Sequence, residues 1–201
     1  MRKSTTTILF FISAILFSSN LFAHECSKYI DSICAESREI SSCDKDLIKD
    51  YTGALYIPVN EHLRKINVDK TCLPIVKNLL SILQKIPVTG PKIIYRGVRR
   101  LDSLKSLKTG DCFTDLAFVS TTAIEAATMD FIRYEPEAAI LKIKSKTGRD
   151  ISQFSDYPEE SEVLLLPNTL LKFEKKETVT DRIEKYHFKE VSRKDCSIIK
   201  K

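Results

Sequence analysis

The sequence predicts a single domain of the α+β class, and two observations support this prediction. Amphipathic helical patterns fill the amino-terminal half, whereas short apolar runs rich in β-branched and aromatic residues gather after Pro91. Strands that follow the helices in clusters, without regular alternation, favour α+β over a doubly wound α/β fold. No linker-like Gly, Ser or Pro stretch and no internal repeat divides residues 24–201. We therefore expect one domain over these residues.

The helical half contains two amphipathic segments. Apolar residues recur at helical spacing over residues 46–64, and we expect a break near Pro58, because proline lacks the backbone donor that a helix uses. A second helix is expected over residues 73–86, with Pro74 at its start and Pro87 just beyond its end. The first half is therefore expected to be mostly helical.

The second half is expected to be mainly sheet. Helical spacing predicts two short helices, over residues 101–107 and 124–132. The apolar or alternating runs that predict strands are residues 93–95, 116–119, 139–143, 162–166, 169–173 and 182–191.

The amino terminus has the features of a secretory signal peptide. Arg2 and Lys3 precede an apolar run over residues 8–17, and a polar break then leads to Leu-Phe-Ala at residues 21–23. The alternative is an uncleaved membrane anchor, but the run is shorter than the roughly 18 apolar residues that span a bilayer. We therefore expect cleavage after Ala23, a secreted product, and no membrane span in the mature chain.

All the cysteines lie beyond this cleavage site. They are Cys26, Cys34, Cys43, Cys72, Cys112 and Cys196. An even number in an exported chain predicts three disulfides, and buried free thiols are the alternative. Fifteen pairings are possible in principle. Because domain termini often lie close together, we expect Cys26 to pair with Cys196 as a clasp.

Charge and motif content exclude several functional classes. The formal net charge of +5 falls to +3 without the two basic residues of the signal peptide, and acidic residues alternate with basic ones along the chain. Such a mild excess argues against a nucleic-acid partner. The glycines are too scattered for a phosphate-binding loop, and no two cysteines or histidines have zinc-site spacing. We therefore expect no bound metal.

Three polar signatures stand at the ends of predicted strands: Tyr-Arg-Gly at residues 95–97, Phe-Val-Ser-Thr-Thr at 118–122, and Tyr-Pro-Glu-Glu-Ser-Glu at 157–162. Each alone has an ordinary interpretation as an ion-pair partner, a turn or a solvated acidic face. Together they can break a glycosidic bond beside a phosphate. Arg96 can grip a diphosphate, Ser120 can hold a carboxylate, and Glu162 can stabilise a developing oxocarbenium ion.

A second carboxylate completes this set. If residues 160–163 are extended, Glu160 and Glu162 point to the same face. An arginine guanidinium, with a pKa of about 12.5–13.8, is not nucleophilic until a base takes its proton. Glu160 suits that task.

In this order the signatures resemble the Arg-Ser-Glu class of mono-ADP-ribosyltransferases, which includes vertebrate ecto-enzymes and bacterial toxins. The likeness runs over residues 46–176 and includes Tyr-Thr-Gly at 51–53 and Asn-Glu-His-Leu-Arg at 60–64. The resemblance implies a secreted, monomeric enzyme that transfers ADP-ribose from NAD to arginine side chains of a target protein and releases nicotinamide. It also implies two packed, mostly antiparallel sheets around an NAD cleft, with the amino-terminal helices against one sheet.

The resemblance also implies roles on the NAD side of the cleft. Arg96 would contact the phosphates of NAD, and Ser120 would position Glu162, the catalytic glutamate. Gly97, Thr121 and Thr122 would complete the NAD site. The commonest family pattern is Ser-Thr-Ser, so the third residue departs from it here while keeping a hydroxyl.

On the acceptor side, Glu160 would orient the arginine and help remove its proton. Tyr157 matches the aromatic residue that touches the protein substrate in this family, and a tyrosine that packs only the turn is an equal alternative. Two other functions remain open. An NAD glycohydrolase of the same fold would need Glu162 but not Glu160, and a disulfide-rich secreted binding module would need neither.

Overall fold

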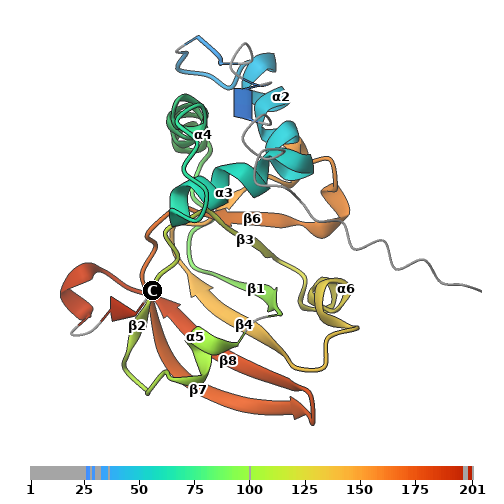
Figure 1. Cartoon of the computed structure of the whole chain (residues 1–201), viewed down its shortest axis with the longest axis vertical. Coiled ribbons are helices and arrows are strands. Elements are labelled where there is room, and N and C mark those ends of the chain that lie inside the picture. The colour runs from blue at the N-terminus through green and yellow to red at the C-terminus, as the bar shows by residue number, and fades with distance from the viewer. Residues whose placement is uncertain are drawn as a thin grey trace, which may run out of the picture.

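The computed structural model of the chain describes residues 26–27, 29, 33–35, 37–99 and 101–196, together with the backbone of residues 199–200. The expected signal peptide, residues 1–23, lies outside the described residues. Helices of the first half gather at one end of the molecule and the strands fill the rest (Figure 1). The predicted α+β class is confirmed.

The first helical segment is continuous where a break was expected. Helix α2 (Ser42–Asp50) runs into a π-helical turn, η2 (Tyr51–Leu55), and then into α3 (Tyr56–Arg64). A capping box between Ser41 and Asp44 begins α2. The break predicted near Pro58 is wrong, because this proline lies in the first turn of α3, directly after the change in hydrogen-bond spacing that accommodates its missing donor.

Helix α4 (Cys72–Lys85) lies within a residue of its predicted bounds. Its apolar stripe packs with η2 and α3 in a core that also takes Leu164 from the sheet and Phe118 from the residue just before a strand. A buried ion pair, with 2.8 Å between Lys85 Nζ and Asp44 Oδ2, ties α4 to α2. The amino-terminal helices thus cover one part of the sheet, as expected.

The strands are connected through hydrogen bonds in the order β5-β6-β3-β1-β4-β8-β7-β2-β9. Their bounds are β1 (Lys92–Val98), β2 (Cys112–Phe113), β3 (Val119–Thr122), β4 (Ala138–Ser145), β5 (Arg149–Asp150), β6 (Glu162–Leu165), β7 (Leu171–Thr180), β8 (Ile183–Glu190) and β9 (Ile199–Lys200). The β4·β8 and β2·β9 pairs are parallel, and the other neighbouring pairs are antiparallel.

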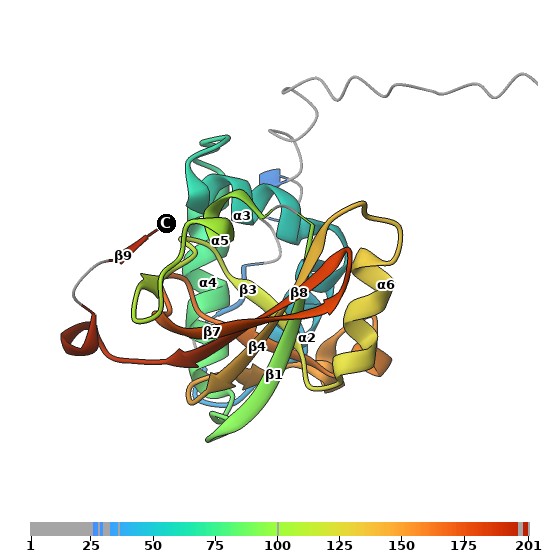
Figure 2. The ribbon, with the colours of Figure 1, turned by 90° about the horizontal axis from the view of Figure 1, so that it is seen from below.

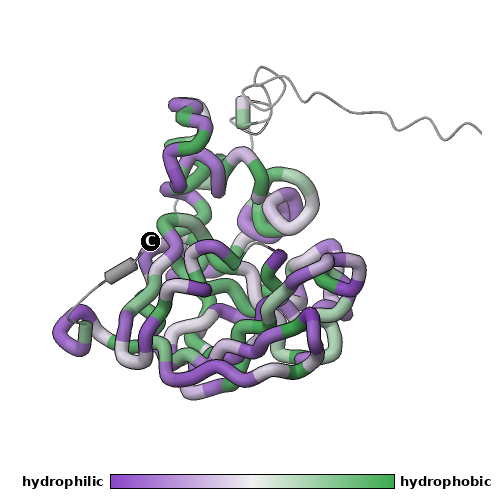
Figure 3. The backbone as a smooth tube through the Cα atoms, turned by 60° about the horizontal axis from the view of Figure 1, so that its bottom comes forward, coloured by the Kyte–Doolittle hydropathy of each residue, from purple (hydrophilic) through white to green (hydrophobic). Residues whose placement is uncertain are grey.

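The pairing between β3 and β1 is short, and Tyr95 opposite Thr122 is the residue pair in register there. The two expected sheets are therefore joined at this point. Figure 2 shows β1, β4, β8 and β7 as neighbours, with α6 (Thr128–Ile132) to one side. Val163 and Leu165 of β6 belong to a second core cluster together with Ile143 of β4, so strands on both sides of this point share one core. Hydrophobic segments accordingly lie in the middle of the molecule in Figure 3.

The remaining elements are short. They are α5 (Asp102–Lys105) and the 3-10 turns Glu125–Ala127, Ser152–Phe154, Pro158–Glu160 and Arg193–Asp195. The strand predicted over residues 116–119 is mostly wrong, since β3 begins only at Val119. The backbone N–H of Ala117 donates to Asp115 Oδ1 at 3.0 Å, and this turn keeps Leu116 and Ala117 out of the strand.

Three disulfides are present, as predicted, but the expected clasp between Cys26 and Cys196 is wrong. The pairs are Cys26–Cys72, Cys34–Cys43 and Cys112–Cys196. Cys26 is buried in the helical core, whereas Cys196 follows β8 and lies beside β2. The two ends of the domain therefore belong to different layers, and each is tied to the layer it packs on.

Candidate active site

A cleft of about 660 Å³ opens between the helical layer and the strands β1 and β3. Every site residue predicted from the sequence lines it. These residues are Arg96, Gly97, Ser120, Thr121, Thr122, Tyr157, Glu160 and Glu162. The fold thus brings together three segments that are well separated along the chain.

Glu162 is the first residue of β6, and only 5% of it is exposed. In the antiparallel β3·β6 pair, Thr122 lies opposite Glu162 and Ser120 lies one diagonal step away on the same face. The Ser120 side chain is hydrogen-bonded to the carboxylate. Burial raises the pKa of Glu162, an effect that the Ser120 hydrogen bond and Arg96 oppose and that Glu160 reinforces.

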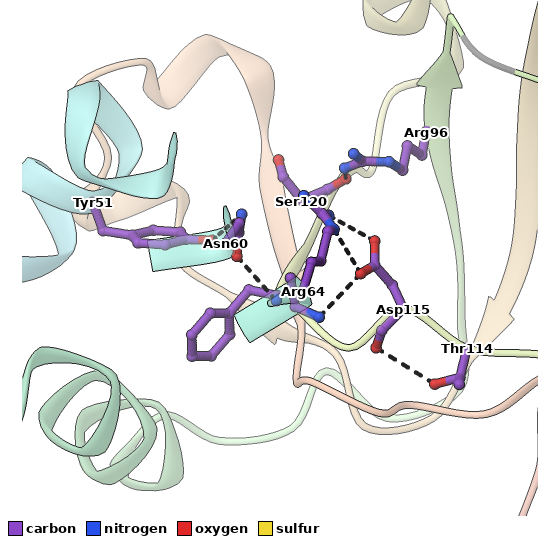
Figure 4. A network of polar contacts seen from close by, with 9 residues as sticks. Tyr51, Asn60, Arg64, Arg96, Thr114, Asp115 and Ser120 are labelled. Carbon is purple, nitrogen blue, oxygen red and sulfur yellow. Dashed lines mark hydrogen bonds and ion pairs between the residues drawn. The ribbon is translucent and has the colours of Figure 1, made fainter. Parts of the chain in front are cut away.

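Arg96 projects from β1 into the same space. Its Nη1 donates to the backbone carbonyl of Ser120 at 2.5 Å, which fixes the guanidinium beside the strand that carries the serine (Figure 4). Burial lowers the pKa of Arg96, and the charge of Asp115 opposes this. An arginine still carries its positive charge under these conditions, so Arg96 offers a fixed cation to an anionic ligand.

Gly97 lines the cleft, and packing also requires a glycine at this position. A Cβ atom at this position would lie 2.9 Å from both the Thr128 carbonyl oxygen and Ile132 Cγ2. Only glycine lets α6 approach β1 this closely. Gly97 thus sets how far α6 stands from the strand of Arg96.

Helix α3 adds polar groups to which the sequence assigned no role. Arg64 donates to both carboxylate oxygens of Asp115, at 2.9 and 2.7 Å, and this pairing raises its pKa. Asn60 donates to the Tyr51 hydroxyl at 3.2 Å and accepts from the backbone N–H of Phe118 at 3.2 Å (Figure 4). These contacts hold α3 against the residues that lead into β3.

Arg64 also lines the cleft, close enough for its charge to lower the pKa of Arg96. The signal that could have identified it is the i, i+4 spacing of Asn60 and Arg64, which puts both on one face of a helix. The cleft therefore has a cationic side made by two arginines.

The segment before β6 differs from the sequence prediction. Residues 160–163 are not one extended strand, because Glu160 ends a 3-10 turn and Ser161 has a left-handed backbone with φ of 48°. Glu160 and Glu162 nevertheless both line the cleft. Burial raises the pKa of Glu160, and the neighbouring Glu159 adds to this effect. Tyr157, from the same segment, is 46% exposed.

The two threonines after Ser120 make backbone contacts. The Thr122 hydroxyl donates to the Glu160 carbonyl at 2.6 Å, and the buried Thr121 hydroxyl donates to the Val163 carbonyl. Both therefore join β3 to the segment that carries the glutamates. These contacts explain a need for hydroxyls at 121 and 122 without involving a ligand.

Two further observations concern metals and membranes. Among the described residues, Cys26, Asp69 and Cys72 lie close enough to share a metal, but the two cysteines form a disulfide and offer no thiolate. Within the same part of the chain, no helix combines the length and the apolar character needed to cross a membrane.

Comparison with known proteins places this geometry in a family. Residues 27–194 match the model of the ADP-ribosyltransferase exoenzyme family. Mav of Mycobacterium avium (strain 104), whose name provisionally assigns it to the NAD(+)–arginine ADP-ribosyltransferases, is 32% identical over 126 residues, which are 62% of this chain and 15% of Mav. Vis of Vibrio splendidus (strain 12B01), named in the same way, is 26% identical over an alignment of 146 positions that covers 64% of this chain and 57% of Vis.

Solved structures share the fold. The crystal structure of ADP-ribosyltransferase Vis with the M6 inhibitor has a TM-score of 0.70 at 22% identity and covers 90% of this chain and 89% of that one. ADP-ribosyltransferase HopU1 of Pseudomonas syringae pv. Tomato DC3000 has a TM-score of 0.67 at 23% identity, with 85% and 82% covered. The fold, the arrangement of Arg96, Ser120 and Glu162, and the match over most of the chain agree: this chain belongs to the ADP-ribosyltransferase exoenzyme family.

Proposed function

We propose that the chain is a secreted mono-ADP-ribosyltransferase that uses NAD to modify arginine side chains of a target protein. The observation that carries the proposal is the convergence of Arg96, Ser120 and Glu162 in one cleft, which Glu160 also lines. The disulfides agree with an oxidising destination outside the cell.

The cationic side of the cleft suits the diphosphate of NAD. Arg96 is held at the edge of β3, and Arg64 is oriented by Asp115, so both guanidinium groups are in place before a substrate arrives. A planar guanidinium binds phosphate oxygens through parallel, charge-assisted hydrogen bonds. NAD bound in this way would place its nicotinamide ribose toward Glu162.

Glu162 then acts on the bond that breaks. The bond between the ribose C1′ and the nicotinamide nitrogen breaks, and its electron pair leaves with nicotinamide. The ribose becomes an oxocarbenium ion, which the buried carboxylate of Glu162 stabilises. Ser120 keeps that carboxylate oriented through its hydrogen bond.

Glu160 serves the acceptor. It takes a proton from the guanidinium of the target arginine, and the freed nitrogen pair forms a bond to C1′, which completes the transfer. The pKa of Glu160, raised by its burial, makes it a better base than an exposed glutamate. Tyr157 lines the same cleft and is largely exposed, so it can contact the target protein.

The relatives support an arginine acceptor. Vis has been crystallised with agmatine, a small guanidine, and both Vis and Mav carry arginine in their names. This chain spans only 15% of the length of Mav and 57% of the length of Vis, so its activity and its target protein are proposals and are not inherited from these relatives.

The test is to incubate the oxidised domain with labelled NAD and agmatine, and to follow nicotinamide release and labelled agmatine together. The proposal predicts both products. A glycohydrolase would release nicotinamide at full rate without labelling agmatine or any arginine of a cell lysate, and an inactive binding module would do neither.

A further inference from the structure

The segment that carries the acceptor-side residues is held at both of its ends. We call residues 155–160 the acceptor loop, which includes Tyr157 and Glu160. Asp156 and Tyr157 are exposed, so the strands do not bury this part of the loop. Its position therefore depends on a few polar contacts.

One end of the acceptor loop is attached to the π-helical turn η2, which lies 104 residues earlier in the chain. The backbone N–H of Asp156 donates to Thr52 Oγ1 at 3.1 Å. The same hydroxyl donates to the Lys49 carbonyl at 3.0 Å, so the helix fixes its direction. A Cβ atom on Gly53 would lie 3.2 Å from Asp156 Oδ2, which shows how closely the loop approaches the turn.

The other end is attached to β3. Thr122 donates to the Glu160 carbonyl, as described above, and the backbone N–H of Ala123 donates to the Ser161 carbonyl at 3.0 Å. Glu162, in contrast, is held by the β3·β6 pairing and by Ser120, independently of Thr52. The two glutamates of the cleft are thus supported by different parts of the fold.

An ion pair also joins the loop to α2, but it contributes little. Lys49 Nζ lies 3.3 Å from Asp156 Oδ1, and the two side chains are 60% and 38% exposed. Exposed pairs of this kind are typically worth less than about 1 kcal/mol. The hydroxyl of Thr52, with its fixed direction, is the stronger contact.

We infer that Thr52 is a positioning residue for the acceptor: by holding the Asp156 amide it keeps the acceptor loop, and with it Glu160, where an arginine can react. This inference rests on the proposed function. Without the Thr52 contact, NAD is still cleaved at Glu162, but more of the ribosyl cation is captured by water. Thr52 therefore sets the fraction of cleaved NAD whose ADP-ribose is transferred to the acceptor rather than to water.

The test compares Thr52→Val, which keeps the shape and removes the hydroxyl, with Thr52→Ser, which keeps the hydroxyl. The loss of one hydrogen bond typically changes an equilibrium or a rate by roughly fivefold. For Thr52→Val we expect the ratio of labelled agmatine to released nicotinamide to fall about fivefold and the KM for agmatine to rise, with NAD cleavage unchanged. Thr52→Ser should restore the ratio, and Asp156→Asn, which keeps the amide contact, should change it little.

Thr169→Val is the matched control. Its hydroxyl also bonds a backbone carbonyl, that of Leu166 at 2.7 Å, but it lies in the turn between β6 and β7. An equal fall in the agmatine ratio for this control would overturn the inference. So would a Thr52→Val protein whose NAD cleavage falls in parallel with transfer, or whose ratio stays at the wild-type value.

Amide hydrogen exchange separates this inference from the proposed function. In Thr52→Val the Asp156 amide and the rest of the acceptor loop should exchange at least about fivefold faster, with the helical core unchanged. If wild type cleaves NAD but never labels agmatine, the proposed transferase falls. The exchange data still decide whether Thr52 anchors the acceptor loop. Exchange rates of the loop that are the same in Thr52→Val and wild type would overturn this role.

Discussion

Replacing Glu162 with glutamine tests the centre of the proposed mechanism, because it removes a charge and keeps the shape. Glu162 is 5% exposed and is held by Ser120, so glutamine can occupy the same place. A carboxylate about 4 Å from a developing unit charge, at an effective dielectric constant of about 20, contributes roughly 4 kcal/mol. That energy corresponds to a rate loss of about 10³-fold, in line with other preorganised electrostatic groups.

The assay is nicotinamide release from NAD by the purified, oxidised domain, measured for Glu162→Gln and for Glu159→Gln. Glu159 is exposed in the 3-10 turn that precedes β6 and does not line the cleft, so its substitution should leave the rate within about twofold. The thermal unfolding of both variants shows that they are folded. A Glu162→Gln protein that releases nicotinamide within tenfold of wild type would refute the assigned role.

Four further outcomes follow from the site and the disulfides. Glu160→Gln should keep NAD cleavage yet lose agmatine labelling, because an amide cannot take a proton from a guanidinium; equal loss of both would contradict the division of roles. Arg96→Lys should weaken NAD binding about tenfold in calorimetry, since an ammonium cannot form the two parallel bonds, and an unchanged Kd would count against phosphate contact. Reduction should destabilise the domain by roughly 2–4 kcal/mol per bridge, and six freely titrating thiols in native material would exclude the disulfides. Because burial raises the pKa of Glu162, the folded chain binds a proton at this carboxylate more tightly than the unfolded chain does. The free energy of unfolding therefore falls as the pH rises from the ordinary pKa to the raised one. Glu162→Gln should accordingly have a higher Tm than wild type at neutral pH, and an unchanged Tm would argue against the raised pKa.

Much of the fold could be predicted because it depends on local patterns. The apolar stripe of α4 buries one face of that helix, and the short apolar runs of β1, β4 and β6 supply the buried residues of their strands. Both patterns can be recognised in the spacing of a few neighbouring residues. The three polar signatures are also local runs. Their residues meet in one cleft, and the family match supports the resemblance that they indicated.

Other features depend on where distant segments meet, so periodicity could not show them. Pro58 continues a helix only because a π-helical turn precedes it, and Glu160 reaches the cleft from a 3-10 turn rather than from a strand. The bond between Arg64 and Asp115 joins residues 51 positions apart. None of these leaves a trace in the hydrophobic spacing of its own segment.

The cysteines show the same difference between what a local sequence pattern predicts and what contacts between distant segments decide. Six cysteines after a candidate signal peptide predicted three bridges, because the sequence gives the number of cysteines and the leader pattern indicates an oxidising compartment. Their partners were decided by the tertiary structure. Cys26 packs in the helical core beside the start of α4, and Cys196 lies next to β2, so each thiol meets the one that folding brings within bonding distance and not the one at the opposite terminus.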